Sequence, residues 1–266
     1  MKTVVISGAS SGIGLDLAKT YAKQGANVIL LARNQARLDS AVSECKNNAI
    51  NTNQSIFSFS VDVNDKEKLA ACAAEVKAKV AAPDVLILSA GIIASVRFVD
   101  QRAQDFEHLL STNVMGSRAV VQAFLPDMMA NRHGNICFIS SLAGVIPAYG
   151  YSAYSASKFA LIGMAGAMRQ EFAEYNIGVS VVCPPEVDTP MVENEAKHIL
   201  PQTRFTKDLG GMLSVEAVTK SVLKGVAKNR FMIIPGAMAK FSYWCARVFP
   251  RTFSAIMQLL IRLSSK

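Results

Sequence analysis

The chain has 266 residues, of which 51% are hydrophobic and 18% charged, and a formal net charge of +8. This length suits one large domain with a buried core, and no uninterrupted apolar run reaches the roughly 20 residues of a spanning helix. The excess positive charge follows Glu216, where nine Lys or Arg and no acid occur, so we expect a negatively charged partner at this end.

The start of the chain and its cysteines indicate the compartment. An apolar strand pattern begins at Thr3 and runs straight into glycines, so we expect no signal peptide and a protein that is not secreted. The five cysteines are odd in number and contain no C-x-x-C pair, which favours buried, reduced thiols in the cytoplasm. The three histidines show no metal-ligand spacing, and we predict no metal.

Short apolar runs alternate with helical stretches along most of the chain. The runs occupy residues 3–7, 28–32, 56–61, 85–89, 135–140, 179–183 and 231–234. This alternation predicts an α/β fold, a single Rossmann-type doubly wound domain with a seven-stranded, mainly parallel sheet flanked by helices. Ligands of such sheets bind at the carboxyl ends of the strands, so the residues that follow each strand are the candidates for a site.

A glycine-rich loop follows the first strand. Gly8, Gly12 and Gly14 have the spacing G-x-x-x-G-x-G, and glycines let a backbone turn tightly against a pyrophosphate bound by amides at a helix start. A structural turn also needs glycine, but the position after strand one favours dinucleotide binding. The candidate residues of the loop are Gly8, Ser10, Ser11, Gly12, Ile13 and Gly14.

The ends of the second and third strands predict which dinucleotide binds. An NAD-binding unit usually has an acid after the second strand, whereas this chain has Ala32 and Arg33. A guanidinium can bind the 2′-phosphate, so we predict NADP(H); alternatively, Arg33 is a solvated loop charge. Asp62 and Val63 follow the third strand, where Asp62 is placed to accept from the adenine amino group or to cap the next helix.

Tyr154 and Lys158 lie four residues apart among Ser and Ala, so on a helix they share one face. An ammonium beside a phenol favours the ionised form and lowers a pKa that starts near ~10, which suits a general acid/base. Ser141, directly after a strand, can hydrogen-bond a substrate oxygen. Asn113 can hold a water linked to Lys158 or bond the local backbone.

In combination, the glycine loop, Asn113, Ser141, Tyr154 and Lys158 resemble the short-chain dehydrogenase/reductase family over residues 3–235. The resemblance implies a catalytic tetrad: Tyr154 is the acid/base, Lys158 lowers its pKa and binds the nicotinamide ribose, Ser141 orients the carbonyl, and Asn113 maintains a proton relay. The nicotinamide supplies hydride, and a homodimer or homotetramer is expected. Further cofactor contacts are implied for Ala90, Gly91, Pro184, Val187 and Thr189.

Two positions depart from the family pattern. Ser89 stands where the family usually has a second Asn, and Pro185 where a Gly usually follows Pro184. Serine replaces only part of the hydrogen bonding of asparagine, and proline stiffens a loop that faces the nicotinamide. Neither change removes a member of the tetrad.

A closer resemblance concerns the substrate. The runs Y-S-A-S-K-F-A at 154–160 and C-P-P-E-V-D-T-P at 183–190 resemble 3-ketodihydrosphingosine reductases. This resemblance implies NADPH-dependent reduction of the 3-keto group of 3-ketodihydrosphingosine to dihydrosphingosine in sphingolipid biosynthesis. Two alternatives stay open: a reductase of another lipophilic carbonyl or alcohol (3-oxoacyl thioester, steroid or retinoid), and a non-catalytic NADP-binding, membrane-associated protein.

The organisation we expect is an NADP-binding catalytic domain at 1–236 and a basic amphipathic extension at 237–266. Within the first, residues 191–211 lie where the family has its substrate lid. Their polar composition predicts a mobile loop, in which Glu193 or Glu195 is a candidate partner for a substrate ammonium.

The extension reads as two short helices broken at Pro250. In the second, apolar residues follow helical spacing on one face and polar residues take the other: Phe253, Ile256, Met257, Leu260 and Leu263 against Arg251, Gln258 and Arg262. We expect this helix, with Tyr243 and Trp244, to lie on a membrane surface on the cytoplasmic side, or to pack on the domain or a partner subunit. No aromatic-rich groove accompanies the charge, so we predict no nucleic-acid partner.

Overall fold

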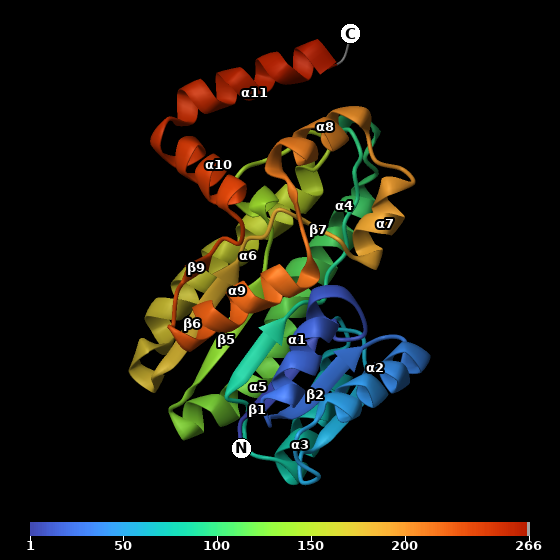
Figure 1. Ribbon diagram of the computed structural model, residues 1–266, viewed down its shortest axis with the longest axis vertical. Helices are drawn as coiled ribbons and strands as arrows, with labels where there is room; N and C mark the ends of the chain where they lie inside the picture. Colours follow the sequence, from blue (N-terminus) through green and yellow to red (C-terminus); the bar gives the residue numbers. More distant parts are fainter. Residues whose placement is uncertain (265–266) are drawn as a thin grey trace.

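The structure, a computed structural model, describes residues 1–264 and is built on a parallel β-sheet (Figure 1). The sheet has the order β3-β2-β1-β4-β5-β6-β9, and every neighbouring pair is parallel. Its strands are β1 (Thr3–Ser7), β2 (Asn27–Ala32), β3 (Ile56–Ser60), β4 (Val85–Leu88), β5 (Gly134–Ile139), β6 (Ile177–Val182) and β9 (Met232–Ile233). The predicted seven-stranded doubly wound sheet is confirmed.

Helices cover both faces of the sheet and form a core with each. One face carries α1 (Gly12–Lys23), α2 (Gln35–Asn48) and α9 (Val215–Ala227); the other carries α3 (Lys66–Lys79), α5 (Ser117–Asn131) and α6 (Ser152–Glu171). Consecutive residues of β1 enter different cores, since Val4 packs with the first set of helices and Val5 with the second. Burial on both faces explains why the inner strands β1, β2, β4 and β6 are largely apolar along their whole length.

The carboxyl ends of the strands carry the remaining elements. A π-helical turn (Ser111–Gly116) joins α4 (Ala103–Leu110) to α5, and a short 3₁₀ helix (Leu142–Gly144) follows β5. The strand order reverses between β1 and β4, which opens a crevice at the ends of these two strands.

The segment expected to be a mobile loop is instead largely helical. It contains α7 (Pro190–Ala196) and α8 (Pro201–Gly210), bounded by a small parallel ladder of β7 (Glu186–Val187) and β8 (Met212–Leu213). Each helix starts with a proline, whose fixed φ angle suits the first helical position. Of the polar side chains that suggested a loop, Glu195 pairs with Lys207 and Asp208 with Arg204.

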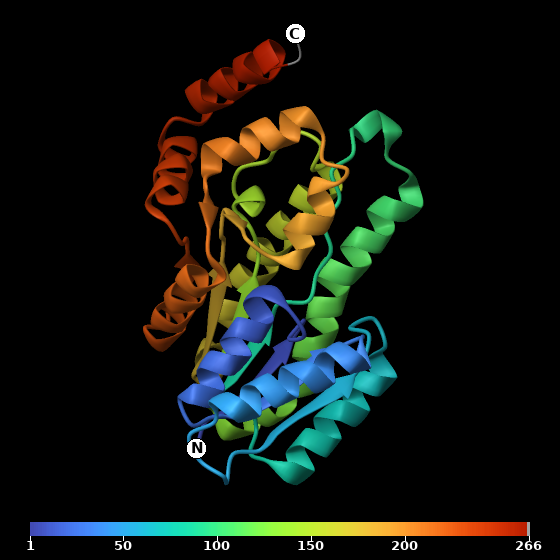
Figure 2. The same ribbon diagram turned by 45° about the vertical axis from the view of Figure 1, so that its right-hand side comes forward.

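The extension forms the two predicted helices, α10 (Ala237–Val248) and α11 (Pro250–Ser264), with Pro250 opening the second. α11 packs against α10 and α8 at the end of the molecule opposite the N-terminus (Figures 1 and 2). The apolar residues predicted for one face of α11 differ in burial. Phe253, Met257 and Leu260 are half-buried, whereas Ile256 and Leu263 are exposed. Within residues 1–264, no helix is long and apolar enough to cross a bilayer.

Candidate active site

A cavity of about 520 Å³ runs along the carboxyl ends of the central strands. It begins at the glycine loop after β1, passes Ser141 and Tyr154, and reaches Met257 on α11. Its volume lies within the ~300–1,000 Å³ typical of small-molecule and cofactor sites.

Most of the residues proposed from the sequence line this one cavity. They are Gly8, Ser10, Ser11, Gly12, Ile13, Arg33, Asp62, Val63, Ala90, Gly91, Ser141, Tyr154, Lys158, Pro184, Val187 and Thr189. Gly14 and Asn113 lie outside the lining and support it from behind.

The glycine loop is shaped by close backbone approaches. Gly8 has φ +70°, and a Cβ there would lie 2.6 Å from the amide nitrogen of Ala90; a Cβ on Gly14 would lie 2.3 Å from the carbonyl oxygen of Gly8. Ser11, the N-cap of α1, makes no side-chain hydrogen bond to the first turn. The first amides of α1 are therefore left to bind an anion, and the loop fits the pyrophosphate of a dinucleotide.

The end of β2 places cationic groups at the outer end of the cavity. Arg33 lies 3.8 Å from Asp62 in an exposed ion pair, and Asn34 caps α2 by accepting a hydrogen bond from the backbone of Arg37. The Arg37 side chain also lines the cavity. Sequence reasoning missed Arg37, which lies in the first turn of α2, close after Arg33 in the sequence.

Asp62 does not cap the following helix. Its carboxylate accepts a hydrogen bond from the backbone of Asn64, whereas the N-cap of α3 is Asp65, which accepts from the backbone of Lys68. The capping alternative is therefore wrong for Asp62, which leaves its carboxylate at the cavity wall beside Arg33.

Tyr154 and Lys158 are buried on one face of α6, as their spacing predicts. The Lys158 ammonium lies 5.6 Å from the centre of the Tyr154 ring and donates a hydrogen bond to the carbonyl oxygen of Ile139, 3.0 Å away. β5 thus holds Lys158 at the point where the strand enters the site.

Burial dominates the titration of this pair. It raises the pKa of Tyr154 to about 12, against which a hydrogen bond with Ser141 acts, and it lowers the pKa of Lys158 to about 8. The net direction for Tyr154 is therefore opposite to the one expected from a neighbouring ammonium, because burial is the largest cause. Helical spacing predicted that the Lys158 ammonium lies beside the Tyr154 phenol. It did not predict that both groups are buried, which shifts the pKa of each toward its uncharged form.

Asn113 ties the loop after β4 to α6 behind the cavity. Its Oδ1 accepts from the backbone of Ile92 at 2.8 Å, and its Nδ2 donates to the carbonyl oxygen of Ile92 and to the Ser157 hydroxyl, at 3.0 and 2.9 Å. The π-helical turn widens the helix at this residue, a feature common at functional sites. Asn113 positions Gly91, where a Cβ would lie only 3.1 Å from the Asn113 oxygen.

The two departures from the family pattern both line the cavity. Ser89 follows β4, and Pro185 lies in the loop after β6. That loop is anchored because the carbonyl oxygen of Pro184 accepts a 2.7 Å hydrogen bond from the amide of Leu142, directly after Ser141. Glu186, which follows the two prolines, is therefore held in a fixed position at the wall of the cavity.

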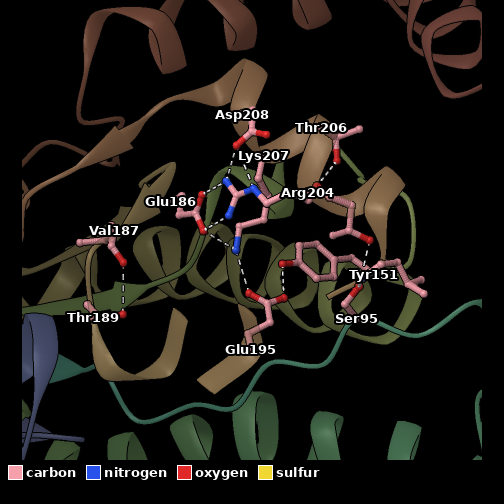
Figure 3. A network of polar contacts seen from close by, with 12 residues as sticks. Ser95, Tyr151, Glu186, Val187, Thr189, Glu195, Arg204, Thr206, Lys207 and Asp208 are labelled. Carbon is pink, nitrogen blue, oxygen red and sulfur yellow. Dashed lines mark hydrogen bonds and ion pairs between the residues drawn. The ribbon is translucent and has the colours of Figure 1, made fainter. Parts of the chain in front are cut away.

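Glu186 belongs to a polar network that sequence reasoning missed (Figure 3). Lys207 of α8 lies 2.8 Å from Glu186 and 2.7 Å from Glu195 of α7, and Arg204 also pairs with Glu186. The two carboxylate side chains are only 1% and 3% exposed. Burial alone would raise the pKa of Glu186, but hydrogen bonds from Arg204 and Lys207 outweigh it and hold the pKa below its usual value.

The network reaches α6 through Tyr151, the N-cap residue of this helix. The Tyr151 hydroxyl donates to Glu195 (Figure 3). The ring of Tyr151 packs edge-on against that of Tyr154, with centroids 5.1 Å apart. Of the two lid acids considered from the sequence, Glu193 is exposed, and Glu195 already binds Tyr151 and Lys207. Neither lines the cavity, whereas Glu186 does.

Comparisons with known proteins agree with this geometry. A family model described as short chain dehydrogenase matches residues 2–199. The chain is 37% identical over 231 residues to the 3-ketodihydrosphingosine reductase of Bos taurus. This alignment covers 86% of this chain and 69% of the relative. It is 30% identical over 264 residues to estradiol 17-beta-dehydrogenase 11 of Macaca fascicularis, covering 98% and 83% of the two chains. A solved short-chain dehydrogenase from Sphingobium yanoikuyae in complex with NADPH has the same fold, with a TM-score of 0.77 at 24% identity over 100% of this chain and 96% of that one.

Proposed function

Since the chain belongs to the short-chain dehydrogenase family, we propose that it is an NADPH-dependent reductase of the 3-keto group of 3-ketodihydrosphingosine. The observation that carries this proposal is the shape of the cavity, which passes the Tyr154 hydroxyl and continues to Met257 of α11. Beyond Tyr154 its wall is largely apolar, with Ile92, Ile93 and Ala148 among the lining residues, as a long-chain ketone requires.

The residues present fit NADP(H). The amides at the start of α1 would hold the pyrophosphate, Arg33 with Arg37 the 2′-phosphate, and Lys158 the nicotinamide ribose. When bound, the cofactor supplies the hydride that adds to the carbonyl carbon. The absence of an acid at the end of β2 supports the phosphorylated cofactor, because a carboxylate there would repel the phosphate.

A side chain of the protein supplies the proton that the reaction needs. With a pKa raised to about 12, Tyr154 is protonated at neutral pH and holds the proton that a reduced carbonyl oxygen must receive. Ser141, which hydrogen-bonds Tyr154, is placed to orient the same oxygen. Asn113 fixes the Gly91–Ile92 turn and α6, so we assign it a positioning role.

The extension supports an encounter with a membrane surface. α10 and α11 expose Phe241, Trp244, Ile256, Leu259 and Leu263. Arg and Lys side chains lie between these residues and no acid is present, which favours anionic lipid. Since the proposed substrate is a lipid, peripheral association through these helices would bring the cavity to its source.

One other function is favoured by a specific observation. The alignment with the macaque estradiol dehydrogenase covers 98% of the chain, including the extension, whereas the bovine reductase covers 86%. A steroid or another lipophilic carbonyl is therefore the second candidate substrate.

The test is NADPH consumption by purified, detergent-supported protein offered 3-ketodihydrosphingosine, a ketosteroid, retinal and a 3-oxoacyl thioester, with Tyr154→Phe as the control. Selective turnover of the sphingoid ketone that is lost in Tyr154→Phe is expected. Turnover of another carbonyl alone would contradict the substrate, and tight NADPH binding with no turnover of any ketone would favour a non-catalytic role.

A further inference from the structure

A second cavity, of about 530 Å³, lies beneath α11. Its walls come from α11, from Ala246 near the end of α10, and from the segment between β5 and α6. The lining is Val145, Ile146, Pro147, Tyr149, Ala246, Pro250, Phe253, Ser254, Met257, Gln258, Ile261 and Arg262. Apart from Ser254, Gln258 and Arg262, these side chains are apolar or aromatic, so the cavity suits a hydrocarbon.

The second cavity adjoins the catalytic one. Ile146, Pro147 and Met257 line both, so the two spaces meet at the wall formed by these three side chains. Tyr154 and Ser141 line the first cavity but not the second. A chain attached to a carbonyl at Tyr154 reaches the second cavity past these three side chains.

We propose that this second cavity is the binding site for the alkyl chain of the substrate, with α11 as its outer wall; the proposal rests on the proposed function. The catalytic cavity must already accommodate the cofactor and the reacting carbon. A long saturated chain needs further apolar space next to that site, and the adjoining cavity supplies it.

Two neighbouring lines of apolar residues on α11 provide a route by which an alkyl chain could enter the second cavity. Phe253, Met257 and Ile261, at i, i+4 and i+8, line the cavity. A neighbouring line of apolar residues, Ile256, Leu259 and Leu263, is 51%, 56% and 58% exposed. When the exposed line is buried in a bilayer, α11 separates lipid from the cavity, and an alkyl chain can pass around the helix without crossing water.

The first experiment changes the volume of the cavity without touching the catalytic residues. Ser254→Trp places an indole in the lining, and the matched control Ala255→Trp adds the same bulk to an exposed residue of α11 outside it. The full-length variants are assayed in detergent with a long-chain 3-keto amino alcohol and its water-soluble short-chain analogue. We expect Ser254→Trp to lower kcat/KM for the long-chain ketone roughly tenfold or more and the short-chain value by less than about twofold, with Ala255→Trp close to wild type. Equal effects of Ser254→Trp on both ketones, or none on either, would overturn the proposal.

A second experiment does not depend on turnover. A long-chain alkyl ketone with a photoreactive diazirine at the end of its chain is bound to the wild-type protein with NADPH, irradiated, and its cross-links are mapped by mass spectrometry. Labels on residues that line only the second cavity, such as Tyr149, Phe253 and Ile261, support the alkyl site even if this ketone is not reduced, which would contradict only the proposed activity. Labels confined to other segments would contradict the alkyl site even in an active enzyme.

Discussion

The hydroxyl of Tyr151 donates a hydrogen bond to the carboxylate of Glu195, and this contact joins the start of α6 to α7 in the segment proposed as the lid. Tyr151 lies three residues before Tyr154 and packs against its ring, while Glu195 shares Lys207 with Glu186. The position of the lid and the surroundings of Tyr154 are therefore set by one group of side chains.

Lys207→Met should loosen the lid, because it leaves Glu186 and Glu195 buried without the cation between them. Removing one partner of a buried ion pair typically costs about 3–5 kcal/mol, although Arg204 still compensates Glu186 here. We expect faster hydrogen exchange across residues 190–210 and a KM for the ketone raised severalfold. The control is Lys197→Met, which removes an exposed lysine of the same segment. Unchanged exchange in Lys207→Met would show that the network does not hold the lid.

Tyr154→Phe and Tyr151→Phe remove the same atom from adjacent rings. If Tyr154 donates the proton, its loss should lower kcat at least ~100-fold while NADPH binding is retained. Tyr151→Phe removes only the bond to Glu195, and we expect less than a tenfold loss, mainly through KM. Steady-state kinetics with NADPH-binding titrations check both, and similar losses in the two variants would argue against a special role for Tyr154.

The sheet and the glycine loop could be predicted because their signals are local. Most strands are largely apolar runs, and Gly14 is required by a close contact with the carbonyl oxygen of Gly8 within one βα turn. Tyr154 and Lys158 share a helix face by spacing alone. These features depend on residues that are near one another in the sequence.

The features that sequence reasoning missed or misjudged depend on distant partners. Asn113 bonds Ile92 and Ser157, which are 21 and 44 positions away, and Tyr151 and Glu195 are 44 apart. The polar composition of the lid predicted a loop because pairing between acids and bases of different helices cannot be read from composition. The raised pKa of Tyr154 follows from burial, which also depends on the whole fold.

Lys158→Met should stabilise the protein at neutral pH, at the expense of activity. The pKa of Lys158 is 10.5 in its ordinary state and about 8 when buried, so below pH 8 the folded chain holds a desolvated charge. Between about pH 8 and 10.5 the unfolded chain binds more protons at Lys158 than the folded chain does. The free energy of unfolding of the wild-type protein therefore increases as the pH rises through this range. We expect Lys158→Met to raise the free energy of unfolding by on the order of 1–3 kcal/mol at pH 7, with a smaller gain near pH 9.5. Urea denaturation at both values checks this; an equal gain at both would contradict a buried charge at Lys158.

Arg33→Ala should change cofactor preference. A hydrogen bond to a charged group contributes about 1.5–3 kcal/mol, so loss of the guanidinium should raise the KM for NADPH roughly ten- to a hundredfold and leave that for NADH nearly unchanged. Arg118→Ala, which removes an exposed arginine on α5, is the control. Equal effects on the two cofactors would show that Arg33 does not read the 2′-phosphate, and Arg37 would then be the next residue to change.

Paired substitutions on the exposed side of α11 should separate membrane binding from chemistry. Ile256→Glu with Leu259→Glu adds two negative charges to a surface proposed to enter anionic lipid, and neither residue lines a cavity. We expect binding to anionic vesicles to fall at least tenfold, while turnover of a water-soluble ketone in detergent-free buffer stays within about twofold of wild type. Vesicle sedimentation measures the first and NADPH absorbance the second. Undiminished sedimentation would mean that this side of α11 does not contact lipid and that its apolar residues pack on a partner subunit instead.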